Sequence, residues 1–112
     1  MSDTETGRKK PEGWVWEQAY ESAKEFLSNV QIKAYMNNSA AVGVAIVQRY
    51  VAAFCVAWDA LEAGKGFVEA KERALGASYE APKNSPPLDE AVVHALIHVA
   101  VFSADALWHK TP

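Results

Sequence analysis

All three histidines of the chain fall in one stretch, HALIHVAVFSADALWH, residues 94–109. His94 and His98 are four residues apart, so on a helix they share a face, and such a pair can hold a transition-metal ion. Glu90, Asp105 and His109 fall on the same arc of a helical wheel. We call these five residues the histidine ridge. Its residue types suggest either metal binding or a polar contact surface.

Distance along the helix limits the metal interpretation. At about 1.5 Å of rise per residue, Asp105 lies roughly 10 Å beyond His98, and Glu90 lies roughly 12 Å before it. An ion with bonds of about 2 Å therefore takes only His94 and His98 from this helix, and needs further ligands from elsewhere. Three interpretations stay open: a solvent-facing ridge, a partner-binding surface at Glu90, His94, His98 and Asp105, or a metal site. The first is favoured, because a largely apolar helix still needs one face toward water.

A second candidate surface comes from the first predicted helix, residues 14–36. Most of its apolar side chains share one arc, whereas Trp14 and Ile32 lie on the polar side, with Met36 near them. Either the helix bends near Asn29, or these three side chains contact something that a polar face would not need, which is a partner or a loop packed over the end of the helix. Aromatic and methionine side chains are enriched in interface cores, so we keep Trp14, Ile32 and Met36 as candidate partner-binding residues.

Other chemistry has little support in the sequence. No histidine stands near Cys55 or a serine, and there is no glycine-rich phosphate loop. We therefore expect a protein that is not an enzyme and that needs no cofactor. The net charge is -3 and no basic stripe is present, which argues against nucleic acid as the main partner. A single cysteine fits a reducing compartment, and we expect a cytoplasmic protein.

Turn-forming residues divide the chain into helices at about 14–36, 39–63, 67–75 and 86–108. This pattern predicts an all-α fold, a compact bundle of three longer helices and one short helix. The bundle should form a single domain over residues 13–112, after a flexible N-terminal tail at 1–12. A proline-stiffened loop, ASYEAPKNSPP, is expected before the last helix.

The second predicted helix is apolar on most sides, which is typical of the central helix of a bundle. Gln48 and Arg49 interrupt its apolar run, and an arginine inside a bilayer costs about 2.5 to 3.5 kcal/mol, so we expect no membrane span. Another backbone, from this chain or a second copy, should be able to approach its narrow strip of small and polar residues. That strip consists of Ala41, Ala45, Gln48, Ala52, Asp59 and Ala63.

These features favour a small, non-catalytic helical interaction module: an adaptor, subunit, regulator or inhibitor that binds a protein partner of unknown identity. A homodimer is also expected, because four tryptophans and four phenylalanines are difficult to bury in one chain of 112 residues. The alternative hypothesis is a metal- or small-ligand-binding bundle that uses His94 and His98.

Overall fold

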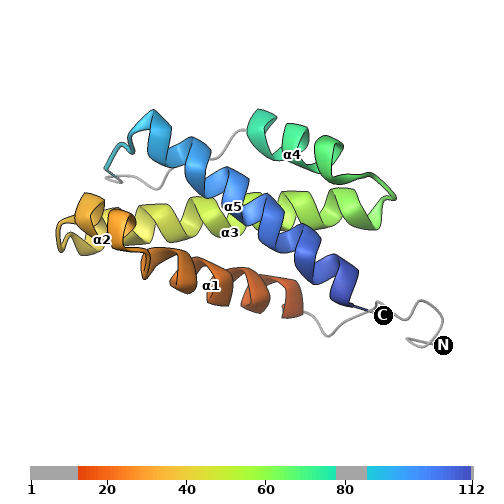
Figure 1. Cartoon of the computed structure of the whole chain (residues 1–112), viewed down its shortest axis with the longest axis horizontal. Helices are drawn as coiled ribbons and strands as arrows, with labels where there is room; N and C mark the ends of the chain where they lie inside the picture. The colour runs from red at the N-terminus through yellow and green to blue at the C-terminus, as the bar shows by residue number, and fades with distance from the viewer. Residues whose placement is uncertain (1–12, 78–85, 112) are drawn as a thin grey trace.

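The computed structural model describes residues 13–77 and 86–111. The expected tail at 1–12 and most of the expected proline-stiffened loop lie outside this part of the chain. The described residues form five helices and no strand, so the all-α fold class is confirmed (Figure 1). In chain order the helices are α1 (Trp14–Leu27), α2 (Val30–Met36), α3 (Ala40–Glu62), α4 (Phe67–Gly76) and α5 (Glu90–Lys110).

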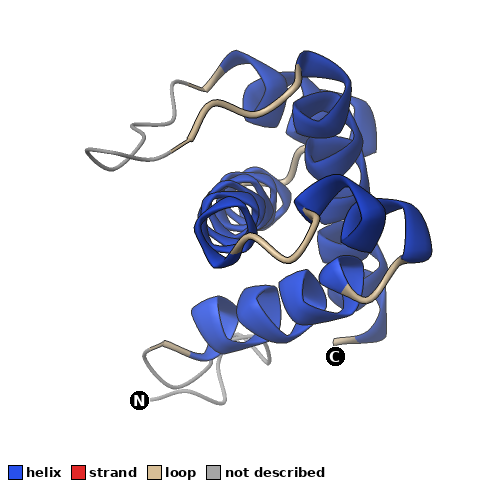
Figure 2. Ribbon diagram, turned by 90° about the vertical axis from the view of Figure 1, so that its left-hand side faces the viewer, coloured by secondary structure: helices blue, strands red, loops and turns tan. Residues whose placement is uncertain are grey.

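Helix α3 is the centre of the bundle, as its apolar sequence predicts. It runs along the long axis of the molecule, with α1 and α4 on different sides and α5 crossing it obliquely (Figure 1). Figure 2, turned by 90°, shows the other helices arranged around this core. The largest fully buried side chains come from α3 and α5: Trp58, Tyr50, Phe54, Ile46, Leu96 and Val101.

The prediction of one helix over residues 14–36 is wrong, because Ser28 and Asn29 interrupt it and separate α1 from α2. The Ser28 hydroxyl donates to the Glu25 carbonyl at 2.6 Å, which closes α1. Asn29 is extended, and its side-chain oxygen accepts from the backbone N–H of Gln31 at 2.8 Å and of Ile32 at 3.3 Å. Asn29 thus caps a new helix. Of the two alternatives for this segment, the bend near Asn29 is confirmed.

A tight turn then returns the chain along α1. Asn37 and Asn38 have φ of 49° and 64°, a left-handed conformation that asparagine tolerates better than most residues. Ser39 accepts from the backbone N–H of Val42 at 3.3 Å and caps α3. Because of this reversal, α3 runs antiparallel to α1 (Figure 1).

The last helix begins at Glu90 and not at the predicted Pro86. Pro87 disfavours a helical conformation at Pro86, and the Asp89 carboxylate accepts from the backbone N–H of Ala91 at 3.2 Å as the actual cap. The backbone N–H of Asp89 in turn donates to the Tyr35 hydroxyl at 2.9 Å. The start of α5 is therefore fixed to α2, a contact between distant parts of the chain.

One end of the core is an aromatic cluster around Trp58, which is 1% exposed. Trp14 and Trp108 meet it edge-on, with ring centroids 5.7 Å and 5.2 Å away. Of the eight tryptophans and phenylalanines, all in the described residues, only Trp16 (53%) and Phe102 (61%) are among the exposed large side chains. A single chain thus covers most of its aromatic surface, which weakens the argument that led to the homodimer. The dimer stays a prediction.

Two helices, α3 and α5, are long and apolar enough to cross a membrane by length and composition alone. In the bundle, 44% of the most apolar window of α3 is buried, against 28% for α5. A helix in the core of a folded domain meets the same criterion. The central position of α3 in the bundle therefore accounts for its apolar sequence. Helix α5 has more of its apolar sequence at the surface.

Candidate functional site

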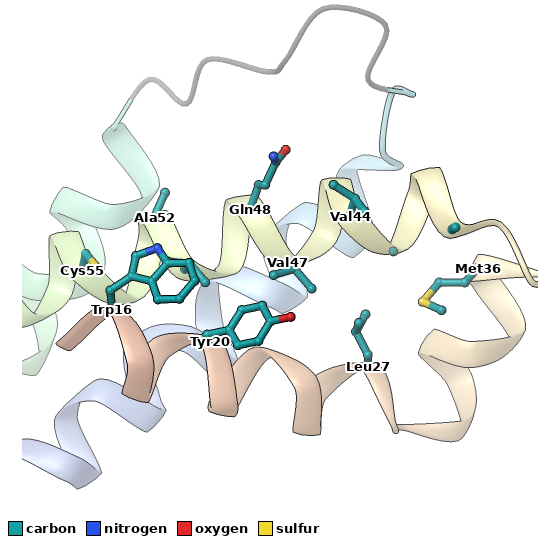
Figure 3. Close-up of a pocket in the computed structure, with 12 residues that line it drawn as sticks. Trp16, Tyr20, Leu27, Met36, Val44, Val47, Gln48, Ala52 and Cys55 are labelled. Atoms are coloured by element: carbon teal, nitrogen blue, oxygen red, sulfur yellow. The ribbon is translucent and has the colours of Figure 1, made fainter. Parts of the chain in front are cut away.

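An apolar groove with a volume of about 830 Å³ lies between α1, α2 and α3 (Figure 3). We call it the α1–α3 groove. Its lining is almost entirely aliphatic, aromatic or sulfur-containing, and consists of Trp16, Tyr20, Leu27, Met36, Ala40, Gly43, Val44, Val47, Gln48, Val51, Ala52 and Cys55.

Aromatic rings form the α1 wall of the groove. Trp16 and Tyr20, one helical turn apart, stack with ring centroids 5.2 Å apart and planes at 7°. The Lys24 ammonium lies 5.3 Å from the Tyr20 ring centroid and forms an ion pair of 3.1 Å with Glu21. These contacts hold Trp16 and Tyr20 in place although both are exposed, which makes them preorganised contact residues.

Helix α3 supplies the floor and the outer rim. Val47 and Val51 pack against the core, whereas Val44 is 55% exposed at the rim. At Gly43 an added Cβ would meet the Met36 methyl at 3.7 Å, so α2 and α3 come close there and close that side of the groove. Trp16 and Cys55 mark one end of the groove, and Met36 marks the other (Figure 3).

The electrostatics of the groove do not favour catalysis. Burial raises the pKa of the Cys55 thiol above its ordinary value, and the nearby Asp59 charge adds to the increase. At neutral pH the thiol therefore stays protonated and is a poor nucleophile. Gln48 and the polar tips of Tyr20 and Trp16 are the other polar groups of the lining. This surface is suited to contact with apolar side chains.

A smaller polar cleft of about 400 Å³ lies on the opposite side of α1, toward α5. At its base the buried Tyr50 hydroxyl donates to Ser103 at 3.2 Å and lies 2.6 Å from the Ser22 hydroxyl. Since Tyr50 has one hydroxyl proton, Ser22 is the donor in the second bond. These bonds satisfy the buried phenol and join α1, α3 and α5 to one another. We assign the cleft a structural role.

The histidine ridge remains at the surface. Glu90, His94 and His98 are exposed, and Asp105 is half-buried and lies 3.4 Å from His109. Within 13–77 and 86–111, no group of three or more histidine, cysteine or acidic side chains is placed to hold a metal ion. A metal site at His94 and His98 would therefore need ligands from outside the described part of this chain.

The structure separates the other three predicted residues. Trp14 packs on Trp58 at the beginning of α1, and Met36 lines the far end of the α1–α3 groove. Ile32 is 8% exposed and belongs to the core. The three do not form one continuous patch, although Met36 contributes to the groove.

Sequence reasoning missed Trp16, Tyr20 and Val44 as site residues. Trp16 and Tyr20 share the apolar arc of α1, which makes them look like core residues before the neighbouring helix is placed. One signal was available: the predicted strip of small residues on α3 includes Gln48 and Ala52, and both line the groove. The strip marked where another backbone can approach, but not which walls would surround it.

Comparison of this chain with protein-family models, with curated proteins and with solved structures found no match to any of the three.

Proposed function

We propose that the protein is a non-catalytic interaction module that binds an amphipathic helix of a partner protein in the α1–α3 groove. The observation that carries this proposal is an apolar concave surface bordered by exposed, preorganised aromatic rings. Monomeric proteins rarely leave a continuous apolar surface uncovered unless it binds something. Tryptophan, tyrosine and methionine, all present in the lining, are enriched in the cores of interfaces.

The dimensions of the groove favour a helix. Its lining on α3 extends from Ala40 to Cys55, which corresponds to roughly 22 Å at 1.5 Å per residue. That length matches about four helical turns. The small residues Ala40 and Ala52 let a backbone come close, while Trp16 and Val44 can insert between side chains of the incoming helix. Such helix-in-groove contacts use apolar residues at i, i+3, i+4 and i+7.

The N-terminal segment of this chain is a poor occupant. Residues 1–12, MSDTETGRKKPE, contain only Met1 and Pro11 as apolar side chains, so they cannot form an apolar helical ridge. We therefore assign the groove to a helix of a partner protein. Such a module would act as an adaptor, a subunit or an inhibitor of the protein that supplies the helix.

A designed helical peptide tests this proposal. A fluorescein-labelled peptide of about 16 residues, with leucines at i, i+3, i+4 and i+7 and an uncharged polar face, is titrated with the full chain. Fluorescence anisotropy should show saturable binding that weakens about 30-fold in Trp16→Ala, the size of a hot-spot loss of about 2 kcal/mol. Val44→Glu, which places a charge at the rim, should weaken it similarly.

Phe102→Ala is the matched control, because Phe102 is also a largely exposed aromatic residue but lies on α5. It should leave the peptide affinity unchanged, and a peptide of the same composition with its leucines scattered around the helix should not bind. Absence of saturable binding, or equal affinity in wild type and Trp16→Ala, overturns the proposal. Sedimentation of the unliganded chain supports the proposal if the chain is a monomer, or if it forms a dimer that Trp16→Ala leaves intact. A dimer that Trp16→Ala abolishes would instead make a second copy the occupant.

A further inference from the structure

The two ends of the α1–α3 groove differ in charge. Glu17 follows Trp16 on α1, and Asp59 and Glu62 follow Cys55 by four and seven residues on the same face of α3. All three carboxylates are exposed, and Asp59 and Glu62 lie beyond Cys55 on the α3 face that lines this end of the groove. The other end, at Met36, is followed by the uncharged turn Asn37, Asn38 and Ser39, and the charged residues around it have both signs: Lys33 on α2, and Asp89, whose backbone N–H donates to the Tyr35 hydroxyl.

The carboxylates at the Cys55 end are close enough to influence the groove. The charge of Asp59 contributes to the raised pKa of the Cys55 thiol, which lines the groove. Within the described ranges, none of Glu17, Asp59 and Glu62 takes part in an ion pair. Lys24 on the α1 wall already pairs with Glu21, and Lys65 lies in the turn that follows α3. Along the end of α3 and the turn after it, two carboxylates without an ion pair, Asp59 and Glu62, thus stand against one lysine.

Helix dipoles do not reverse this difference. The positive end of α1 and the negative end of α3 meet near Cys55, and the opposite pair of ends meets near Met36, since the two helices are antiparallel (Figure 1). The contributions of these two helices offset each other at both ends, and α2 adds only the negative end of a seven-residue helix at Met36. The exposed carboxylates of α3 are therefore the full charges that set the potential at the Cys55 end.

We infer that the groove binds its helix in one direction, with lysine or arginine side chains of the partner placed over the Cys55 end. This inference rests on the proposed function and adds the chemistry of the partner to it: an apolar helical ridge that ends in a basic cluster. The apolar ridge supplies most of the affinity, whereas the carboxylates supply the orientation and speed up association.

Cys55, the only cysteine of the chain, provides a readout of direction. Two peptides share one leucine ridge and three lysines at the same end, and each has a single cysteine activated as a mixed disulfide with thionitrobenzoate. In one peptide the cysteine lies at the basic end, and in the other it lies at the neutral end. Attack by the Cys55 thiolate joins peptide and protein and releases thionitrobenzoate, whose absorbance gives the rate.

We expect the basic-end peptide to react about five to ten times faster, since each exposed ion pair contributes a factor of roughly 1.5 to 5. Asp59→Lys should reduce this ratio to about one or invert it. The ratio is the measured quantity, because Asp59→Lys also changes the reactivity of the thiol itself, and does so equally for both peptides. Added salt should lower the ratio, since it screens exposed charges.

Glu25→Lys is the matched control: it makes the same change in net charge, but Glu25 lines the polar cleft on the other side of α1. The ratio should stay unchanged in this variant. The basic residues Arg8, Lys9 and Lys10 precede α1 in the sequence and could compete for the carboxylates. When all three are replaced by serine in the full chain, the ratio should be equal or larger.

Equal rates from both ends in a peptide that binds, as judged by anisotropy, would overturn the inference and leave the proposed function intact. A ratio that Asp59→Lys does not change, or one that Glu25→Lys changes as much, would also overturn it. A collapse of the ratio in the triple serine variant would show that the tail and not the groove selects the direction, with the same consequence. If neither peptide binds, the proposed function itself fails.

Discussion

The α1–α3 groove and the histidine ridge are the two regions of this protein that invite a functional interpretation, and they differ in how they arise. The ridge is made by one helix, and its residues are recognisable by type and spacing. The groove is made by three helices from residues that look ordinary in the sequence. The ridge lies on an exposed helix face, with Glu90, His94 and His98 all at the surface. The groove is a concave surface with a volume of about 830 Å³.

This contrast shows that suggestive residue types and a usable site are separate properties. Catalysis and metal binding need side chains that converge on one point, whereas the side chains on a single exposed helix face point apart into solvent. The histidine ridge lacks a second set of ligands in the described residues. The groove has convergent walls, and its groups are apolar, so it is suited to binding apolar side chains.

The largest expected effect is a difference in unfolding free energy between two aromatic residues, Trp58 in the core near the groove and Phe102 beside the ridge. Trp58→Ala should lower the free energy of unfolding by about 3 to 5 kcal/mol, because it removes a fully buried ring that contacts Trp14 and Trp108 near the Cys55 end of the groove. Phe102→Ala, on α5 beside the ridge, should lower it by less than about 1 kcal/mol, since the ring is 61% exposed. Urea denaturation measures both. Equal losses would contradict the contrast.

A smaller effect concerns the hydroxyl chain that connects α1, a wall of the groove, to α5, which carries the ridge. Tyr50→Phe removes the shared partner of Ser22 and Ser103 and should cost about 1 kcal/mol of unfolding free energy. Tyr20→Phe is the control, because the Tyr20 side chain lies at the exposed groove wall, and it should cost less than about 0.5 kcal/mol. If both variants unfold at the same urea concentration, the chain of hydroxyls does not join the two regions.

The thiol of Cys55 reports on the groove alone. Because burial and then Asp59 raise its pKa, the rate of its reaction with a disulfide reagent should still increase with pH above the ordinary value of 9.0. Asp59→Asn should shift this profile to lower pH by less than unfolding the chain does, because burial is the larger cause. Asp105→Asn, a carboxylate of the ridge, should leave the profile unchanged. A profile identical in folded and unfolded chains would contradict the burial of this thiol.

The same raised pKa has a consequence for stability. The folded chain holds the Cys55 proton more tightly than the unfolded chain does, so the associated stabilisation is complete below the unfolded pKa. It is lost as the pH rises through the folded pKa. Cys55→Ser, which does not titrate in this range, should therefore lose less stability than wild type between pH 8 and pH 11, as measured by thermal melting.

The smallest expected effect is at the ridge. Zinc or nickel should leave the melting temperature unchanged, because His94 and His98 alone provide two of the three or four ligands that such ions take. A chelator provides the baseline. A saturable increase in melting temperature that disappears in His98→Ala would establish the metal hypothesis, and an accompanying dimer would mean that a second copy completes the site.

Part of the fold could be predicted because its causes are local. The caps at Ser39, the Glu69–Arg73 pair at 3.1 Å and the Asp105–His109 pair each join residues within one helical turn. The break at Asn29 was only one of two alternatives, because the same asparagine is compatible with a helix interior when no core draws Ile32 inward. The start of α5 was misplaced although Pro87 and the Asp89 cap are local signals; the Asp89 backbone is held in addition by Tyr35, 54 residues away.

Sequence alone therefore determined the helical class, the approximate helices and the central position of α3, since periodicity and capping depend on neighbours along the chain. It also identified the ridge, which is a property of one helix. Only the tertiary structure decided that Trp16 and Tyr20 stay outside the core while Ile32 enters it. The physical reason is that burial depends on how α1, α2 and α3 cross, and contacts between residues distant in sequence, such as Trp14 with Trp58 and Phe26 with Tyr50, set that crossing.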